Sequence, residues 1–227
     1  MLRVIYLVFT AGHRAAHGSV LVRGDLCDQA IRLARGLTAL LPDEPEVTGL
    51  LSLLLLTDAR RGARVDEAGD LVLLADQDRS KWDYAKIREG EELLHRALLA
   101  GRPGAYQLHA AIAACHSSGE ITDWREVAAL YGQLVRYEPT AVVQANRAAA
   151  VAMADGPAAG LAILDSADLS TRLANWPQLH IARGELLRQL GRDADSMAAY
   201  RTALRLDPPG PEQTFIRRQI ESLGGSP

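Results

Sequence analysis

A repeated spacing near the C-terminal end constrains the fold of this chain most. Tyr131 is followed eight residues later by Pro139, and Tyr200 is followed eight residues later by Pro208. The two pairs lie 69 residues apart, which is about two periods of a 34-residue helix–turn–helix repeat. In such a repeat the aromatic ring fills the gap to the next helix pair, and the proline ends the second helix because it cannot continue one. The spacing therefore predicts stacked helical hairpins in the C-terminal half.

The second of these units carries more of the pattern than the first. Its further members are Gly184, Gly191, Ala203, Leu206 and Asp207. The unit resembles the tetratricopeptide repeat (TPR), in which small residues let two antiparallel helices approach closely. A middle unit matches only at the turn, where Gly156 stands. Arrays of this kind usually present a surface to a partner, and a plain helical bundle with accidental spacing is the alternative.

The composition agrees with an all-α fold. Of the 227 residues 48% are hydrophobic and only 5% aromatic, so leucine, alanine and valine must make up most of the core. Alanine and leucine lose little on entering a helix. A charged fraction of 23% fits a folded chain rather than a disordered one.

The N-terminal half reads as helices interrupted by one extended excursion. Residues 2–10 form a short buried helix or strand, and a helix follows from Asp25 to Leu41. The next helix has Pro45 in its first turn and leucine on nearly every face between positions 50 and 56, which predicts burial all round. A small β-hairpin-like excursion is expected near 63–74, before a long helix that ends near residue 100.

The C-terminal half reads as successive helical hairpins. The predicted pairs are 105–117 with 123–138, 141–154 with 157–166, and 177–190 with 193–206, followed by a capping helix at about 211–223. We expect two domains, a helical subdomain over 1–104 and a short TPR-like α-solenoid over 105–227, onto which the first packs.

Charge and cysteine content indicate what the chain alone does not do. The net charge is −3, so this chain alone should bind promoter DNA weakly or not at all. Cys27 and Cys115 lie far apart without metal-ligand spacing and are expected to be reduced. The apolar runs at 2–10 and 50–56 are too short to span a membrane or to form a signal-peptide core, so the cytoplasm is the expected location.

Motifs for catalysis and cofactor binding are also missing. His13 and His17 could project from one helical turn as metal ligands do, but no acidic or Cys/His cluster accompanies them. The chain contains no phosphate-binding glycine loop and no nucleophile elbow. We therefore expect no enzyme activity, no catalytic residue, no metal and no cofactor.

One segment, from Asp58 to Asp83, is rich in polar residues that have no evident structural role. It could be an architectural arginine–aspartate network at the ends of two helices. It could instead be a docking surface with Trp82 as its aromatic anchor, or, least supported, a catalytic carboxylate pair of Asp76 and Asp78. The predicted docking patch comprises Arg60, Arg61, Asp76, Gln77, Asp78, Arg79, Trp82 and Asp83.

Six strings along the chain resemble one known family. They are 3–9, 25–35, 41–47, 58–61, 76–83 and 148–157, and the fifth contains the specific sequence Asp-Gln-Asp-Arg-Ser. In order and over nearly the whole chain they are similar to the C-terminal extension of extracytoplasmic-function (ECF) RNA polymerase sigma factors that carry a TPR-like tail. The extension follows two sigma domains that bind core polymerase and promoter DNA, and is thought to control or support their activity.

The resemblance implies a regulatory protein-interaction region of such a sigma factor. The implied partners are the sigma domains of the parent protein, core RNA polymerase, or both. This sequence departs from the full-length pattern because it contains no basic helix–turn–helix and no promoter-melting segment. Promoter DNA would therefore be bound only through the sigma domains that this chain lacks. The alternatives from other classes are a stand-alone TPR-type scaffold that binds a peptide or protein, and an enzyme that uses Asp76 and Asp78.

Overall fold

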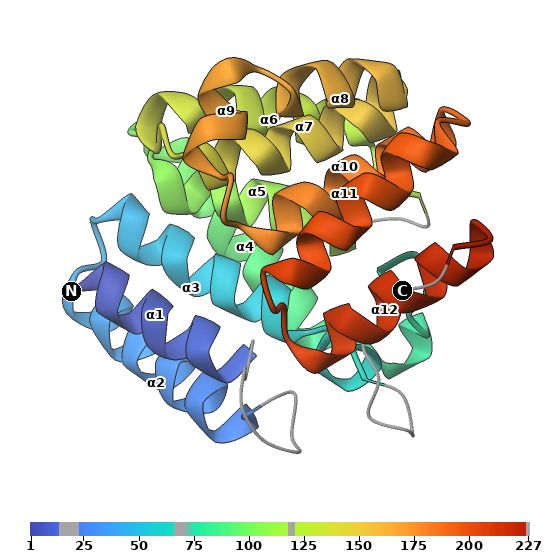
Figure 1. The fold of residues 1–227 in the computed structure, drawn as a ribbon. Coiled ribbons are helices and arrows are strands. Elements are labelled where there is room, and N and C mark those ends of the chain that lie inside the picture. Colours follow the sequence, from blue (N-terminus) through green and yellow to red (C-terminus); the bar gives the residue numbers. More distant parts are fainter. Residues whose placement is uncertain (14–22, 66–71, 73, 118–120, 226–227) are drawn as a thin grey trace. The chain divides into compact units, whose positions relative to one another are not determined.

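The computed structural model describes residues 1–13, 23–65, 72, 74–117 and 121–225. Over these residues the chain is all-α, as predicted, with twelve α-helices, three short 3-10 helices and no strand (Figure 1). It divides into two compact units, Met1–Thr122 and Asp123–Pro227.

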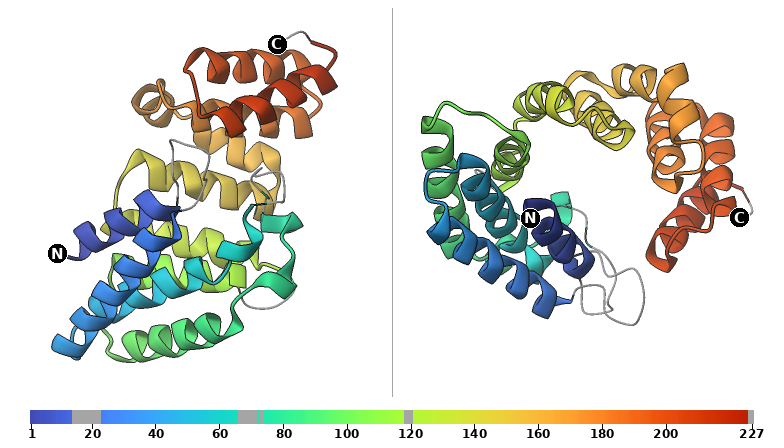
Figure 2. Two further views of the ribbon diagram at one scale, coloured as in Figure 1. Left: turned by 90° about the horizontal axis from the view of Figure 1, so that it is seen from below. Right: turned by 90° about the vertical axis from the view of Figure 1, so that its left-hand side faces the viewer.

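The first unit contains five α-helices and the three 3-10 helices of the described chain (Figures 1 and 2). They are α1 (Leu2–His13), α2 (Gly24–Leu40), α3 (Pro45–Asp58), η1 (Arg61–Ala63), η2 (Leu74–Asp76), η3 (Arg79–Lys81), α4 (Tyr84–Leu99) and α5 (Ala105–Ser117). The second unit consists of α6 (Trp124–Tyr137), α7 (Ala141–Asp155), α8 (Pro157–Leu164), α9 (Ala167–Arg172), α10 (Pro177–Gln189), α11 (Asp193–Arg205) and α12 (Gly210–Ser222).

Helix α3 is the centre of the first unit, as its leucines predicted. Leu50, Leu54, Leu55 and Leu56 are all fully buried, because α1, α2, α4 and α5 each pack against α3. Residues 2–10, for which the sequence left helix and strand open, belong to helix α1, and Ile5 and Phe9 of α1 join the same core. A helix that is apolar all round can only be stable when neighbours cover every face.

Helix α5 belongs to the first unit, so the observed division at Thr122 differs from the predicted one at residue 104. It packs on α3 and α4. Its N-terminus is held by Glu46 of α3, whose carboxylate accepts the backbone N–H groups of Tyr106 and Gln107 at 3.0 and 3.1 Å. The first turn of a helix has unsatisfied N–H groups, and a carboxylate there is favourable. Because this cap comes from a residue 60 positions away, no local pattern predicts it.

The predicted hairpin-like excursion is described only in part. The N–H of Val72 donates to the carbonyl of Arg64 at 2.9 Å, and Val65 forms an isolated bridge. Residues 66–71 and 73, which carry the rest of that prediction, lie outside the described residues.

Within the second unit most helices pack against the next one along the chain. Contacts join α6 with α7, α7 with α8, α10 with α11, and α11 with α12. The hairpins α7–α8 and α10–α11 and the last helix begin and end within a few residues of their predicted limits. The short helix α9 was not predicted, and the predicted pairing of 105–117 with 123–138 is replaced by α5 on α3 and α6 on α7.

The hairpin α10–α11 is closed by a glycine under an aromatic ring. A Cβ at Gly184 would lie 2.8–2.9 Å from three ring atoms of Tyr200, so only glycine admits this approach. Ser196 donates to the Gly184 carbonyl at 2.8 Å, and Tyr200 is fully buried. Tyr131 is only half-buried, so the two tyrosines of the repeated spacing differ in burial. Tyr200 is enclosed because Ile216 and Ile220 of α12 pack around it.

None of the helices over the described ranges combines the length and the apolar character needed to cross a membrane.

Candidate functional site

The two ends of the polar segment meet beside the end of α3. The N–H of Asp83, just before α4, donates to the carbonyl of Ala59, just after α3, at 2.8 Å. The 3-10 helices η1 and η3 lie in contact. The segment between them therefore leaves and returns to one place beside the end of α3.

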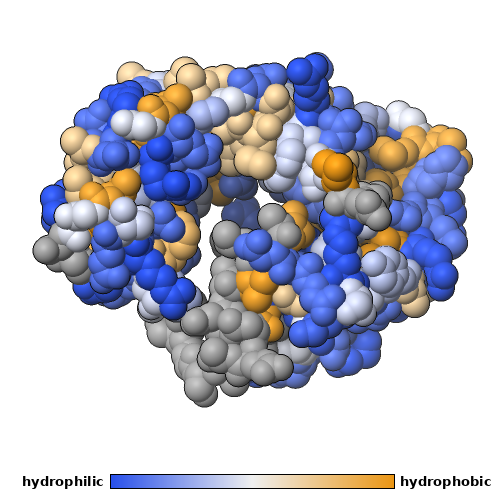
Figure 3. All heavy atoms as spheres, turned by 90° about the vertical axis from the view of Figure 1, so that its right-hand side faces the viewer, coloured by the Kyte–Doolittle hydropathy of each residue, from blue (hydrophilic) through white to orange (hydrophobic). Residues whose placement is uncertain are grey.

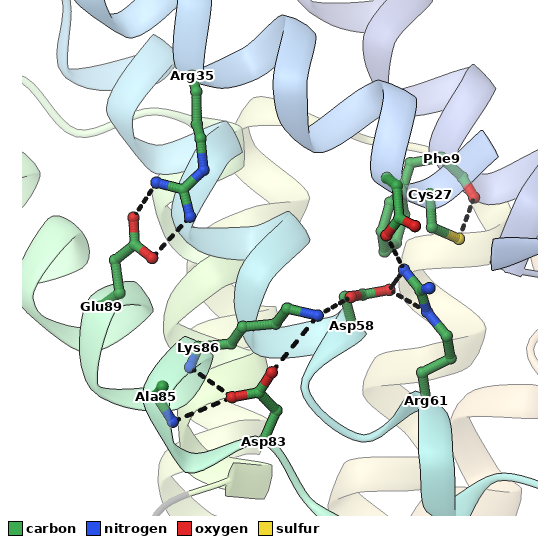
Figure 4. A network of polar contacts seen from close by, with 10 residues as sticks. Phe9, Cys27, Arg35, Asp58, Arg61, Asp83, Ala85, Lys86 and Glu89 are labelled. Atoms are coloured by element: carbon green, nitrogen blue, oxygen red, sulfur yellow. Dashed lines mark hydrogen bonds and ion pairs between the residues drawn. The ribbon is translucent and has the colours of Figure 1, made fainter. Parts of the chain in front are cut away.

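The buried carboxylate of Asp58 organises this place (Figure 4). Its side chain is fully buried at the end of α3. Arg61 donates from Nε to Asp58 Oδ1 at 2.7 Å, and its Nη2 also lies 2.7 Å from Asp28 Oδ1 of α2. Two acids on two helices are thus joined by one guanidinium, whose planar fork suits such bridging.

The second oxygen of Asp58 is used by α4. Lys86 Nζ donates to Asp58 Oδ2 at 2.8 Å and lies 3.5 Å from Asp83 Oδ2. Asp83 is also the N-cap of α4, since its Oδ1 accepts the N–H groups of Ala85 and Lys86, both at 3.1 Å. We call Asp28, Asp58, Arg61, Asp83 and Lys86 the Asp58 network.

The network shifts the pKa values of three of its members, Asp28, Arg61 and Lys86, in the direction that favours their charged forms. The hydrogen bond from Arg61 holds the pKa of Asp28 below its ordinary value. Burial alone would lower the pKa of Lys86 and of Arg61, but the hydrogen bonds to Asp58, and for Arg61 also to Asp28, outweigh it and raise both. These shifts favour the charged forms of Asp28, Arg61 and Lys86, and the ion pairs tie α2, α3 and α4 together.

Trp82 does not serve as an exposed anchor, contrary to the prediction. Its side chain is 4% exposed and packs in a cluster with Leu53, Leu56 and Ile87. The guanidinium of Arg79 covers the ring, with its carbon 4.7 Å from the ring centroid. The tryptophan is buried because η3 folds it inward onto the α3–α4 contact, which leaves Arg79 rather than the ring facing outward.

The remaining patch residues make local contacts. Asp78 Oδ1 accepts the N–H of Ser80 at 2.9 Å and its hydroxyl at 2.7 Å, and these bonds lower the pKa of Asp78. Gln77 donates from Nε2 to the carbonyl of Val72 at 3.3 Å, while Asp76 is exposed. Asp78 is thus used as a turn-forming side chain, which gives no support to a catalytic pair with Asp76.

Arg60 lies on the inner side of the segment as a half-buried cation. Burial, and then the neighbouring charge of Arg64, lower its pKa to about 10. Burial and the charge of Arg60 in turn lower the pKa of His116 to about 4. The predicted patch is therefore divided between inward residues, Arg60 and Trp82, and outward residues, Asp76, Asp78 and Arg79.

Sequence reasoning missed the acid at the centre and two of its partners. Asp58 stands three residues before Arg61, a spacing at which side chains meet on a helix, so this pair had a local signal. Asp28 and Lys86 had none, because their contacts depend on how α2 and α4 pack. Within the described residues, no group of three or more His, Cys, Asp or Glu side chains could hold a metal ion. His17, which was weighed with His13 as a metal ligand and set aside, lies outside those residues.

All five residues of the Asp58 network lie in a part of the chain that matches a protein-family model. Residues 1–98 match a family model described as a family of unknown function (DUF6596). Over 227 residues, 99% of the chain, the sequence is 44% identical to Uncharacterized protein R00370 of Rhizobium meliloti (strain 1021). The chain spans about half the length of this relative, 53%.

Proposed function

We propose that this chain is the regulatory protein-interaction region of an ECF sigma factor and modulates transcription initiation in the cytoplasm. Its partners would be the sigma domains of the parent protein, core RNA polymerase, or both. The observation that carries the proposal is the resemblance of six ordered strings to the C-terminal extension of such factors. The all-α fold with consecutive helical hairpins agrees with that resemblance.

Two further observations support this reading. Three of the six strings, 25–35, 58–61 and 76–83, contribute Asp28, Asp58, Arg61 and Asp83 to the Asp58 network. Almost half of the Rhizobium meliloti relative lies outside the match, which leaves room for the sigma domains.

The surface that docks would be the outward part of the patch, centred on Arg79, Asp76 and Asp78. Arg79 is held in place by the buried ring of Trp82, so it is pre-organised, which lowers the entropic cost of binding. Arginine is also among the residues most often found at binding hot spots. Figure 3 shows one face of the molecule, on which hydrophobic side chains are scattered in small groups among hydrophilic ones.

Binding assays test the proposal. The chain is mixed with core RNA polymerase, and separately with the part of the Rhizobium meliloti relative that lies outside the match. We expect saturable binding to at least one of them, weakened at least about tenfold by Arg79→Ala. Arg88→Ala, an exposed arginine on α4 outside the patch, is the matched control. Absence of binding to both would refute the proposal, and equal binding by wild type and Arg79→Ala would move the docking surface elsewhere.

A gel-shift experiment tests the DNA side of the proposal. With a net charge of −3, the chain alone should not shift a promoter fragment at physiological salt, since phosphate binding depends on clustered lysine and arginine. The whole relative with core polymerase should shift it. Tight, sequence-specific binding by this chain alone would contradict the assignment of DNA binding to the sigma domains.

A stand-alone TPR-type scaffold is the second candidate, and the close packing of Gly184 on Tyr200 in hairpin α10–α11 favours it. It is distinguished by the same binding assays, because a scaffold of this kind would bind a peptide or an unrelated protein and neither polymerase nor the rest of the relative. An enzyme that uses Asp76 and Asp78 has no comparable support, since Asp78 is engaged by Ser80.

A further inference from the structure

A cleft of about 640 Å³ lies in the first unit between α2, α3 and α4. Its volume falls in the range of small-molecule sites. Its apolar lining includes Pro45, Leu51, Leu93 and Ala97, all of which are buried. The cleft is separate from the Asp58 network, because none of the five network residues lines it.

Ion pairs bridge the cleft walls at two places. Arg35 of α2 forms a two-point pair with Glu89 of α4, with Nη2 at 2.7 Å from Oε2, and Figure 4 shows the two side chains reaching toward one another. Arg102, beyond α4, reaches back to the loop between α2 and α3, where it bonds the carbonyl of Asp43 and lies 3.7 Å from Glu44 Oε1. A peptide would need an open-ended groove, so a cleft bridged in this way favours a small molecule.

Two polar groups in the cleft have no partner within the described part of the chain. Arg96 of α4 lines the cleft, and its guanidinium makes no hydrogen bond or ion pair there. Thr48 of α3 is only 7% exposed, lines the same cleft, and its hydroxyl also has no hydrogen-bond partner among the described residues. A threonine hydroxyl in a cleft that has no partner in the chain can donate a hydrogen bond to a ligand or to water.

The charges in the cleft favour an anion. Of the three arginines in the lining, Arg35 is paired with Glu89 and Arg102 with Glu44, so Arg96 is the one that no acid of the described residues neutralises. Arg96 also stands in the last turn of α4, where a cation suits the helix dipole. The helix dipole explains why a cation stands at this position, but it does not explain why apolar side chains lie beside it. A guanidinium next to an apolar floor fits a carboxylate attached to a hydrocarbon body.

We propose that this cleft binds a small amphipathic carboxylate. Its hydrocarbon part would lie on Leu51, Leu93 and Ala97. Its carboxylate would pair with Arg96 and accept a hydrogen bond from Thr48. This ligand site is separate from the proposed docking surface. The proposal does not depend on whether the chain belongs to a sigma factor.

Calorimetric titration with decanoate tests the site. We expect saturable one-to-one binding to the wild-type chain. Arg96→Gln should weaken it at least about tenfold, because a charge-assisted hydrogen bond is lost. Arg96→Lys should weaken it less, since the charge remains and only the forked geometry is lost. Arg88→Gln, on the same helix but outside the cleft, should bind decanoate like the wild type.

Further probes separate the contributions of charge and shape. Ala39→Trp places a large ring at the exposed edge of the cleft and should abolish binding without disturbing the buried floor. Decan-1-ol should bind at least about tenfold more weakly than decanoate. The proposal is overturned if decanoate does not saturate, if Arg96→Gln binds it unchanged, or if decan-1-ol binds equally well. It is also overturned if only an acidic, leucine-rich peptide binds, which would make the cleft a peptide groove.

Discussion

At the scale of single residues, Asp58 has the largest structural consequence in the first unit. Its fully buried carboxylate binds Arg61 through one oxygen and Lys86 through the other. A buried charge of this kind is tolerated only while its partners remain in place. Removing the carboxylate leaves two cations facing each other at the end of α3, and each then keeps only a partly exposed acid, Asp28 or Asp83.

Asp58→Asn should therefore lower the free energy of unfolding by about 2 kcal/mol, less than for a pair that is buried on both sides, because Arg61 and Lys86 are partly exposed. Urea denaturation followed by circular dichroism measures the loss. Asp25→Asn removes an exposed ion pair with Arg23 and should leave stability unchanged. Equal stability of wild type and Asp58→Asn would show that the network is not structural.

His116 makes stability depend on pH. Burial and Arg60 lower its pKa in the folded chain to about 4, from an ordinary 6.5. As pH falls from 6.5 toward 4, the unfolded chain therefore binds the proton first, so stability is complete above 6.5 and is lost through this window. The free energy of unfolding should fall more steeply with decreasing pH in the wild type than in His116→Gln, as measured by denaturation at half-unit intervals. Parallel curves for the two proteins would contradict this account.

At the scale of elements, most helices could be predicted from local patterns, and their pairing could not. Proline at position 45, the leucine run after it and glycine or proline at the turns fix where helices begin and end. Helix α5 was assigned to the wrong neighbour because its apolar residues fit either a hairpin with α6 or the face of α3. The cap from Glu46, which decides for α3, comes from 60 residues away.

The candidate site shows the same limit. The meeting of Ala59 and Asp83 fits their places at the ends of two successive helices. The burial of Trp82 did not, since a tryptophan between polar residues has no periodic pattern that tells an inward ring from an outward one. Asp28 joined the network only through the packing of α2 on α3.

Glycine contacts between helices provide a test at this scale. Gly184→Ala should destabilise the second unit by about 2 kcal/mol, because the new Cβ would lie within 2.8–2.9 Å of the buried Tyr200 ring. Gly132→Ala, in α6, meets no atom within 4 Å and should instead stabilise by about 0.5–1 kcal/mol, the difference in helix propensity. Thermal and urea denaturation measure both. A Gly184→Ala protein as stable as Gly132→Ala would show that the hairpin can separate without cost.

At the scale of the whole molecule, the chain consists of two units, each with its own core. Leu50 and Leu54 lie in clusters drawn only from the first unit, and Leu164 and Leu179 in a cluster drawn only from the second. Each unit therefore has the buried apolar contacts that independent folding requires. The boundary lies after α5 and not before it.

Fragments distinguish the two boundaries. Residues 1–122 and 123–227 should each unfold cooperatively in calorimetry. Residues 1–104 should not, because without α5 the side of α3 that faces Ala110 and Ala113 is left open to water. Strong binding of a hydrophobic dye by 1–104, and weak binding by 1–122, is the expected result. A cooperative transition in 1–104 would return the boundary to the position predicted from the sequence.

The leucines of α3 also have a consequence for the way the protein is made. A ribosome releases α3 well before residues 84–117, which supply two of its covering helices, α4 and α5. During that interval the apolar side chains of α3 are partly exposed to water. Nascent chains in this condition aggregate or bind chaperones. The second unit needs no such delay, because consecutive helices can pack as soon as each pair has emerged. Slow translation between α3 and α5 should therefore increase aggregation of the first unit far more than that of the second.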